Sequence, residues 1–272
     1  MAALVFAVIN VTPDSFSDGG QYLDPAAAVR RGLQAVAEGA DVLDIGGEST
    51  RPSGMTYGQG PREITASEEI DRILPVIERL RAETDRPISV DTRKSEVAAA
   101  ALAAGATYVN DVSGGEFDPA ILRITAASGA RLILMHSRGT PETMATRTQY
   151  GDLVAEVRSE LAERVAAAVS AGVARDRIWV DPGLGFAKTP EQSRILLREL
   201  PALKALRLPI LVGPSRKSVL GSDRPPAERL PESIAAAVLA VQGGASAVRV
   251  HDIEPTVRAL RFLSLVSDGR QE

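Results

Sequence analysis

Eight short apolar runs rich in valine and isoleucine recur along the chain with helical stretches between them, and this alternation constrains the fold most strongly. The runs span 4–10, 41–47, 87–92, 107–115, 131–137, 178–183, 209–215 and 247–252. Alanine-rich amphipathic segments follow several of them, at 25–40, 67–83, 95–106 and 153–173. Nearly continuous apolar runs are typical of strands covered on both faces, as in a parallel sheet. Glycines expected to cap the helical segments are Gly39, Gly105, Gly129 and Gly172.

Eight strand-then-helix units predict an α/β fold, a (β/α)8 TIM barrel. The chain of 272 residues suits one such barrel, which needs roughly 250 residues, so we expect a single domain over 1–272. An open, doubly wound sheet is the main alternative, because the same alternation can build it. The chain has no dinucleotide-binding fingerprint, which favours the closed barrel.

Charge and composition exclude several classes of partner. The net charge of −4 and the sequence pI near 5.5 provide no long-range field to attract nucleic acid, so an anionic ligand would need a local cluster of cations. The chain has no cysteine, so any metal must use oxygen or nitrogen ligands. The apolar N-terminal run of about nine residues lacks a basic leader and is too short to span a membrane. We expect a cytoplasmic protein with neither a nucleic-acid nor a membrane partner.

Polar side chains stand at the end of every predicted strand. These residues are Asn10, Asp44, Asp91, Asn110, Asp111, His136, Asp181, Ser215, Arg249 and His251. A single carboxylate at a strand end is usually a helix cap or a turn former. In a parallel barrel, however, all strand ends meet at the rim that carries the active site. So many polar ends together therefore predict an active site at this rim.

A second pattern places cationic side chains after the second and seventh predicted strands and on the eighth. They are Arg51, Arg216, Lys217, Arg249 and His251. Barrels commonly bind phosphate at the loops after strands seven and eight and at a helix N-terminus. Solvated arginines are the alternative interpretation, but the positions at strand ends rather than on helical faces favour a phosphate-bearing substrate.

The candidate metal ligands and the aromatic residues lead to two further expectations. The chain has only two histidines, which excludes a zinc site of several imidazoles. A hard cation shared with a substrate phosphate needs only one or two protein oxygens, so we expect Mg²⁺ near Asn10 and Asp14. Phe16 lies in a turn-rich segment that could close as a lid, and Phe186 could form a wall for a flat ligand.

Eight sequence motifs occur in order along the chain, and the match that they carry extends from residue 4 to about 263. They are NVTPDSFSDGG, DIGGESTRP, SVDTRK, VNDVSGG, MHSRGTP, DPGLGFAK, GPSRKSVLG and VRVHD. Through them the chain resembles the dihydropteroate synthase family of folate biosynthesis. The resemblance implies a pterin-binding barrel that joins 6-hydroxymethyl-7,8-dihydropterin diphosphate to p-aminobenzoate, giving 7,8-dihydropteroate and diphosphate. It further implies a dissociative displacement in which Mg²⁺ and the cations stabilise the leaving diphosphate.

The same resemblance implies roles for individual residues. The pterin would be bound by Asp91, Asn110, Asp181 and Lys217. The diphosphate would be bound by Asn10, which also seats the metal, and by Arg249 and His251. The p-aminobenzoate pocket would include Phe186 and Ser215, and two loops would contribute Thr12, Pro13, Phe16, Asp18, Thr50 and Arg51. The catalytic residues would be Asn10, Asp91, Lys217, Arg249 and His251.

The chain departs from the family pattern at three places. The second loop, within 52–66, is several residues longer than the usual Arg-Pro-Gly stretch. Ser137 replaces a usual methionine beside His136, and Val219 stands where phenylalanine is common. These changes alter pocket walls and the lid rather than the proposed charges, so turnover and sulfonamide susceptibility stay open at this point. No role follows for Asp44.

Three alternatives to the synthase also stay open at the sequence level. A related methyltransferase barrel, working on methyltetrahydrofolate with a corrinoid partner, would share the pterin contacts but would not need the anion cluster. A noncatalytic paralogue would bind pterin without turnover. A Schiff-base aldolase would use Lys217 as its nucleophile.

The resemblance bears on assembly as well. Members of the family commonly dimerise, and the alanine-rich segment over 233–245 could pack against a second subunit. Ordinary packing of that segment on its own barrel is the alternative. We expect a homodimer.

Overall fold

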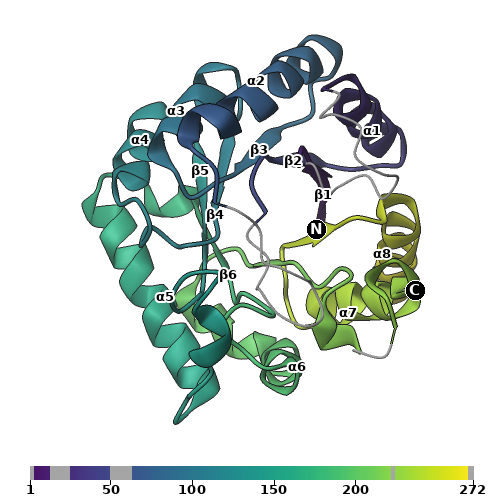
Figure 1. Ribbon diagram of the computed structural model, residues 1–272. Coiled ribbons are helices and arrows are strands. Elements are labelled where there is room, and N and C mark those ends of the chain that lie inside the picture. The colour runs from purple at the N-terminus through teal and green to yellow at the C-terminus, as the bar shows by residue number, and fades with distance from the viewer. Residues whose placement is uncertain (1–2, 13–24, 50–62, 222–223, 269–272) are drawn as a thin grey trace.

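The computed structural model describes residues 3–12, 25–49, 63–221 and 224–268, and shows eight parallel strands surrounded by helices (Figure 1). The strands are β1 (Leu4–Asn10), β2 (Val42–Gly46), β3 (Ile88–Asp91), β4 (Tyr108–Asp111), β5 (Arg131–Met135), β6 (Ile178–Asp181), β7 (Leu211–Val212) and β8 (Ala247–Val250). They pair in the order β6-β5-β4-β3-β2-β1-β8-β7. A parallel bridge between Val180 of β6 and Ile210 closes the ring. The predicted (β/α)8 barrel is therefore confirmed.

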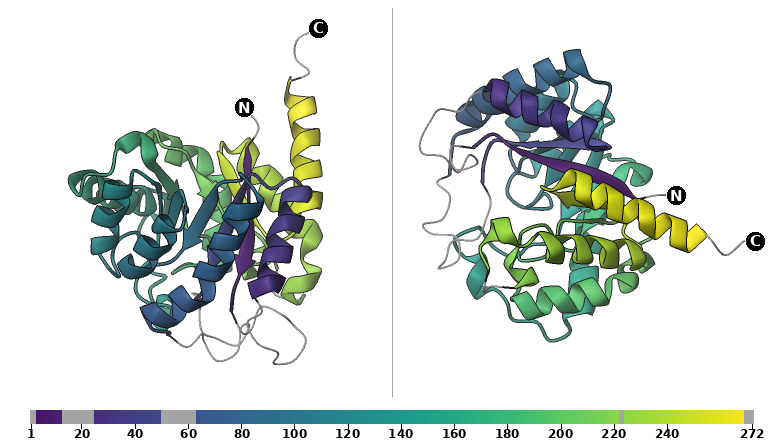
Figure 2. Two further views of the ribbon diagram at one scale, coloured as in Figure 1. Left: turned by 90° about the horizontal axis from the view of Figure 1, so that it is seen from above. Right: turned by 90° about the vertical axis from the view of Figure 1, so that its right-hand side faces the viewer.

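Helices cover the outside of the barrel (Figure 2). The α-helices are α1 (Pro25–Ala37), α2 (Ala66–Glu83), α3 (Ser95–Ala103), α4 (Ala120–Ser128), α5 (Leu153–Ser170), α6 (Pro190–Arg198), α7 (Leu230–Gln242) and α8 (Ile253–Asp268). Short 3-10 helices span Met144–Thr146, Arg175–Arg177, Leu200–Leu206, Ser218–Leu220 and Pro226–Glu228. Within the described residues, no helix is both long and apolar enough to cross a membrane.

Local side-chain chemistry sets where these helices begin and end. Thr65 caps α2, Asp152 caps α5, and Thr189 forms a reciprocal capping box with Gln192 at the start of α6. The predicted glycine caps are confirmed, because all four lie in the left-handed region that favours glycine. Their φ angles are 98° at Gly39, 103° at Gly105, 68° at Gly129 and 102° at Gly172.

The interior of the barrel is built in layers. Phe6, Tyr108 and Trp179 form part of an apolar cluster inside the ring, and the Phe6 and Tyr108 rings meet edge to face with centroids 5.4 Å apart. Side chains two positions apart on a strand share a face. The residues two positions beyond Tyr108 and Trp179 are Asn110 and Asp181, so a polar layer lies directly above the apolar one, toward the carboxyl ends of the strands.

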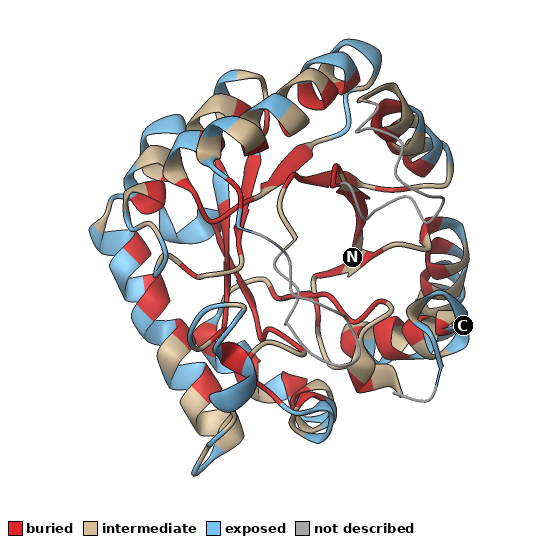
Figure 3. Ribbon diagram, viewed as in Figure 1, coloured by how far each residue is buried: buried red, intermediate tan, exposed pale blue. Residues whose placement is uncertain are grey.

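A second, larger core lies between the barrel wall and the helices. It is built from the alternate strand positions, such as Leu43, Val109 and Leu134, and from the inner faces of the helices. Figure 3 shows this arrangement, with buried strands and helices that are exposed on their outer faces. The two cores pack against both faces of the strands that carry the polar residues, which suits an active site that needs fixed geometry.

Several strands are shorter than their apolar runs predicted. The run at 209–215 yields only Leu211–Val212 as β7, because prolines at positions 209 and 214 lack the N–H that a strand ladder requires. The run at 107–115 yields Tyr108–Asp111 as β4. There Asp111 ends the strand by accepting hydrogen bonds from Ser113 and Gly115 in the following turn.

Candidate active site

Arg249 lies at the centre of the polar layer inside the barrel. Its Nε donates to Oδ2 of Asp44 at 2.5 Å, and its Nη2 donates to Oδ2 of Asp91 at 2.5 Å. The amide of Asn110 donates weakly to the same Asp44 oxygen at 3.4 Å. Asp44 is fully buried, so its charge needs this partner. Asp44, for which the sequence predicted no role, therefore holds Arg249 in place.

Burial shifts the titration of the carboxyls in this layer. It raises the pKa of Asp91 to about 7, against the opposing charge of Arg249 and with the like charge of Asp44 adding to the rise. Burial also raises the pKa of Asp181, although Lys217 and a hydrogen bond from the Gly183 amide (2.7 Å to Oδ1) act in the other direction. Carboxyl groups whose pKa is shifted by burial and by specific charged neighbours are typical of functional sites.

Lys217 enters the same layer from the loop after β7. Its Nζ donates to the carbonyl of Leu184 at 2.8 Å and lies 4.8 Å from the centroid of the Phe186 ring. Burial lowers the pKa of Lys217 to about 8, while the charge of Asp181 opposes that shift. A half-buried cation beside an aromatic face and a carboxylate can orient a flat, polar heterocycle.

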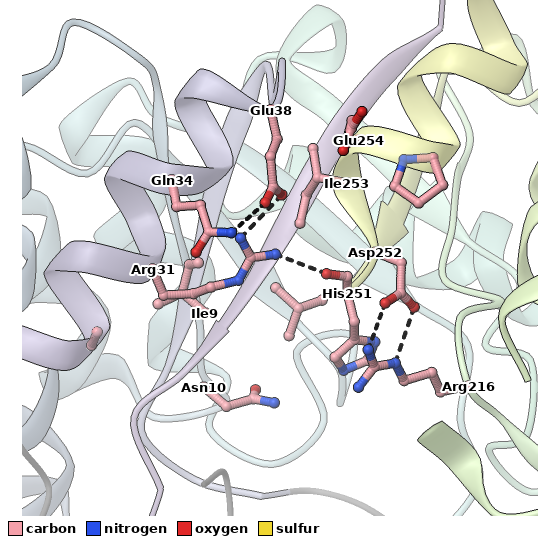
Figure 4. Close-up of a pocket in the computed structure, with 13 residues that line it drawn as sticks. Ile9, Asn10, Arg31, Gln34, Glu38, Arg216, His251, Asp252, Ile253 and Glu254 are labelled. Carbon is pink, nitrogen blue, oxygen red and sulfur yellow. Dashed lines mark hydrogen bonds and ion pairs between the residues drawn. The ribbon is translucent and has the colours of Figure 1, made fainter. Parts of the chain in front are cut away.

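A cavity of about 340 Å³ opens beside this layer, between β1, α1 and the loop that leads into α8 (Figure 4). Asn10 and His251 line it at the rim, and His251 Nδ1 lies 3.0 Å from Ser215 Oγ. Arg31 also lines it and donates to the His251 carbonyl at 2.9 Å. Cavities of this size accept small-molecule groups.

The cations that sequence grouped together are separated by the structure. Lys217 and Arg249 belong to the polar layer inside the barrel. Arg216 lines the cavity but forms a two-pronged ion pair with Asp252, with Nε to Oδ2 at 3.0 Å and Nη2 to Oδ1 at 2.6 Å (Figure 4). Arg51 lies outside the described residues.

The predicted site residues fall into three groups. Asp91, Asn110, Asp181, Lys217 and Arg249 share the polar layer, with Phe186 beside Lys217. Asn10, Ser215 and His251 lie at or beside the cavity, and Thr12 is buried just after β1. Pro13, Phe16, Asp18, Thr50 and Arg51 lie outside the described residues, as does Asp14.

His136 also ends a strand, but its side chain does not reach the polar layer. It is fully buried, with Nε2 3.0 Å from Glu160 and Nδ1 2.8 Å from Nζ of Lys188. Burial and the neighbouring Lys188 lower the pKa of His136 to about 2, so the ring is neutral. Lys188 itself donates to the carbonyls of Gly183 and Phe186, at 3.2 and 2.8 Å, and thereby shapes the loop after β6.

Sequence reasoning missed a buried ionic cluster next to the polar layer. Glu48 pairs with Arg93 at 3.2 Å and with Lys94 at 3.1 Å, and Lys94 also pairs with Glu69 at 2.6 Å. Burial acts to raise the pKa of Glu48, but the two cations outweigh it and hold that pKa below its usual value. A carboxylate oxygen of Glu48 also accepts from the Ile64 amide at 3.2 Å. The glutamate of DIGGEST is thus a structural anchor.

Taken together, the closed parallel barrel, the buried titratable layer and the adjoining cavity define a barrel enzyme that suits a flat, hydrogen-bonding ligand. The family model described as "Pterin binding enzyme" matches residues 6–251. The dihydropteroate synthase of Synechocystis sp. is 48% identical over 253 residues, which cover 92% of this chain and 85% of that one.

Solved structures agree with this similarity. Dihydropteroate synthase of Xanthomonas albilineans with 4-aminobenzoic acid superposes with a TM-score of 0.89 at 44% identity, covering 98% of this chain and 93% of that one. The same enzyme in complex with 7,8-dihydropteroate gives a TM-score of 0.86 at 42% identity, covering 98% and 94% of the two chains. The chain belongs to the dihydropteroate synthase family, the pterin-binding transferases of folate synthesis.

Proposed function

We propose that this protein condenses 6-hydroxymethyl-7,8-dihydropterin diphosphate with p-aminobenzoate and releases 7,8-dihydropteroate and diphosphate. The observation that carries the proposal is the buried polar layer, in which Asp181, Asp91, Asn110 and Lys217 surround Arg249. The Xanthomonas albilineans structures, whose bound molecules are 4-aminobenzoic acid and 7,8-dihydropteroate, support the substrate and product.

In this proposal the pterin ring is bound through its hydrogen-bonding edge. The 2-amino group and N3–H would donate in parallel to the carboxylate of Asp181, while Asn110, Asp91 and Lys217 meet other polar atoms of the ring. Paired hydrogen bonds to a buried carboxylate discriminate strongly, because an analogue that lacks one donor leaves the carboxylate unsatisfied.

The displacement requires no activated side chain, because a neutral aromatic amine is already a nucleophile. In this dissociative displacement the C–O bond to the diphosphate breaks first and the diphosphate leaves with the electron pair, so the pterin methylene carbon becomes cationic. The amine nitrogen then donates its lone pair to that carbon and forms the C–N bond. The amine then loses one proton. Arg249 and His251 would stabilise the departing negative charge, and p-aminobenzoate would lie between Phe186 and Ser215. Preorganised charge of this kind is often the largest catalytic contribution.

We propose that a magnesium ion is shared between Asn10 and the substrate. Asn10 lines the cavity at the rim, and the described residues contain no group of three or more His, Cys, Asp or Glu side chains able to hold an ion. Mg²⁺ is commonly held by one or two protein oxygens together with substrate phosphates and waters. Asn10 would supply the protein oxygen, and the bound ion would reduce the charge that develops on the leaving diphosphate.

The purified protein is expected to form dihydropteroate and diphosphate in equal amounts, with both products dependent on p-aminobenzoate. Both products would be quantified in the same samples, with and without Mg²⁺. Saturable binding of the pterin diphosphate with no product would instead indicate a binding protein. Methyl transfer from methyltetrahydrofolate to a corrinoid, without diphosphate release, would indicate the related methyltransferases.

We also propose that the protein is a cytoplasmic homodimer that pairs through α7 and α8. Leu239 on α7 and Phe262, Leu265 and Val266 on α8 are large apolar side chains that are 54% to 75% exposed. These helices pack against each other, and α8 runs past the barrel edge at its C-terminal end (Figure 2). Contiguous exposed apolar side chains commonly mark an interface.

Sedimentation should give twice the chain mass for the wild type, and the double substitution Phe262→Asp, Leu265→Asp should give a monomer. Two aspartates in an apolar interface would be buried without partners, which costs several kcal/mol. The exposed pair Glu254→Gln, Arg258→Gln on the same helix is the matched control and should leave the dimer intact. A wild type that sediments as a monomer would refute the assembly.

A further inference from the structure

The turn that follows β7 has an unusual backbone at Arg216. Its φ angle is 60°, in the left-handed region, and among the described residues only Ala187 and Arg207 share positive φ without being glycine. An arginine in this conformation is strained, and such residues persist only where the surroundings hold them in place. Arg216 directly precedes Lys217.

Both backbone polar groups of Arg216 and its side chain are held by neighbouring elements. The amide donates to Ser233 Oγ at 3.1 Å, and the carbonyl accepts from Nη1 of Arg229 at 3.1 Å. Ser233 and Arg229 are buried at the start of α7. The guanidinium forms the two-pronged ion pair with Asp252, which directly follows His251 (Figure 4). The turn is thus fixed from α7 and from the end of β8 together.

The consequence appears in the residues on either side of Arg216. Ser215 reaches His251, with Oγ 3.0 Å from Nδ1. Lys217 turns back into the barrel, where its Nζ reaches the Leu184 carbonyl at 2.8 Å. The left-handed turn therefore sends one neighbour toward the cavity and the other into the polar layer.

We propose that Arg216 is a positioning residue. Its ion pair with Asp252 fastens the strained turn to the end of β8, so that Lys217 stays in the pterin site while Ser215 stays against His251. The guanidinium of Arg216 is paired with Asp252, and the task that we assign to this pair is to hold the turn. This inference rests on the proposed function, because it assigns Lys217 to pterin binding.

Three variants distinguish the effect of the ion pair from the effect of the backbone conformation at Arg216. Arg216→Gly keeps a residue that accepts positive φ but removes the ion pair, Asp252→Asn weakens the pair from the other side, and the double variant removes both partners. Each should lower kcat/KM for the pterin diphosphate by about 10- to 100-fold, the scale of a misplacement of about 1 Å. The kcat/KM of the double variant should be no lower than that of the more impaired single variant, because both substitutions remove the same contact.

Arg207→Gly is the matched control. Arg207 has a φ angle of 54° but lies after the 3-10 helix Leu200–Leu206, away from the site residues. This variant should keep kcat/KM within about twofold. Circular dichroism and thermal unfolding would confirm that all variants fold. Normal kinetics in Arg216→Gly and Asp252→Asn would overturn the proposal.

A second readout distinguishes positioning from a general structural role. Burial and the charge of Arg249 lower the pKa of Lys217 to about 8, against the charges of Asp181 and Asp91. The wild type should therefore lose affinity for the pterin diphosphate as pH rises through about 8, where Lys217 loses its proton. If the side chain relaxes toward water in Arg216→Gly, its pKa returns toward about 10.4 and its contact with the pterin is weakened. The alkaline loss of affinity then becomes shallower and moves to higher pH.

Binding calorimetry measures this shift without turnover, so the inference is decided even for a wild type that binds but does not react. The ligand's own titration is common to both proteins and cancels in the comparison. An unchanged alkaline limb in Arg216→Gly, despite weaker binding, would show a merely structural role and overturn the proposal. A wild type that does not bind the pterin diphosphate would overturn the proposed function together with this inference.

Discussion

Replacing Lys217 with methionine is expected to lower kcat/KM for the pterin diphosphate by about a hundredfold or more, the scale of losing a charge-assisted contact in the transition state. Methionine keeps the length of the side chain but removes the cation that faces Asp181 and the Phe186 ring. Asp181 would lose an opposing charge, so its already raised pKa would rise further. Steady-state kinetics with the pterin diphosphate varied measure the loss.

Lys204→Met is the matched control, because Lys204 lies in the 3-10 helix Leu200–Leu206, away from the polar layer. It should retain near-normal kcat/KM. Thermal unfolding of both variants distinguishes a lost contact from a lost fold. A Lys217→Met enzyme that worked at near-wild-type rates would contradict the role assigned to this lysine, and so would an equal loss in Lys204→Met.

Replacing Arg249 with methionine is expected to destabilise the protein by about 3–5 kcal/mol, because breaking a buried ion pair leaves unpaired charges inside the barrel. Arg249 donates to both Asp44 and Asp91 at 2.5 Å. Activity should fall below detection in the same variant, since Arg249 is the shared partner of the polar layer. Urea unfolding monitored by circular dichroism measures the change in the free energy of unfolding.

The pH dependence of that loss tests its electrostatic origin. Burial raises the folded-state pKa of Asp91 to about 7 from an ordinary value of 3.8, so Asp91 binds its proton more tightly in the folded protein, and its contribution to stability falls as pH rises between these values. Without Arg249 the pKa of Asp91 rises further, and the loss of stability with rising pH becomes larger. The variant should therefore lose more stability at pH 8 than at pH 5.

Adding Asp44→Asn to Arg249→Met should restore part of the lost stability, because it removes one of the two orphaned carboxylates. The single change Asp44→Asn in the wild type is the reference for a double-mutant cycle. Equal losses in the free energy of unfolding at pH 5 and pH 8, together with additive effects of the Arg249→Met and Asp44→Asn substitutions, would indicate that Arg249 contributes by packing alone.

The fold could be predicted from sequence because its signals are local. Eight apolar runs with helical segments between them require a covered parallel sheet, and glycines such as Gly39 and Gly105 stand at the predicted helix ends with φ angles of 98° and 103°. Strand lengths were less well predicted. The proline at position 214 and the turn bonds of Asp111 end their strands early, and an apolar run does not reveal such competition.

Part of the site could also be predicted from the alternation of side chains along a strand. This alternation determines which polar side chains at the strand ends point into the barrel and which point toward the helices. Asn110 shares a face with Tyr108 and points inward, whereas Asp111 shares a face with Val109, which belongs to the outer core. His136 shares its face with Leu134, also in the outer core, and pairs with Glu160 of α5. Alternation alone is therefore enough to exclude Asp111 and His136 from the polar layer.

By itself, then, the sequence determined the barrel, the rim at which the polar residues gather and the family, because each depends on local periodicity or on motifs read in order. Only the tertiary structure decided the partners: Asp44 on β2 meets Arg249 on β8, and Arg216 is paired with Asp252. Sequence separation carries no information on these pairs, since closure of the barrel and the register of its strands set which side chains face each other across the interior.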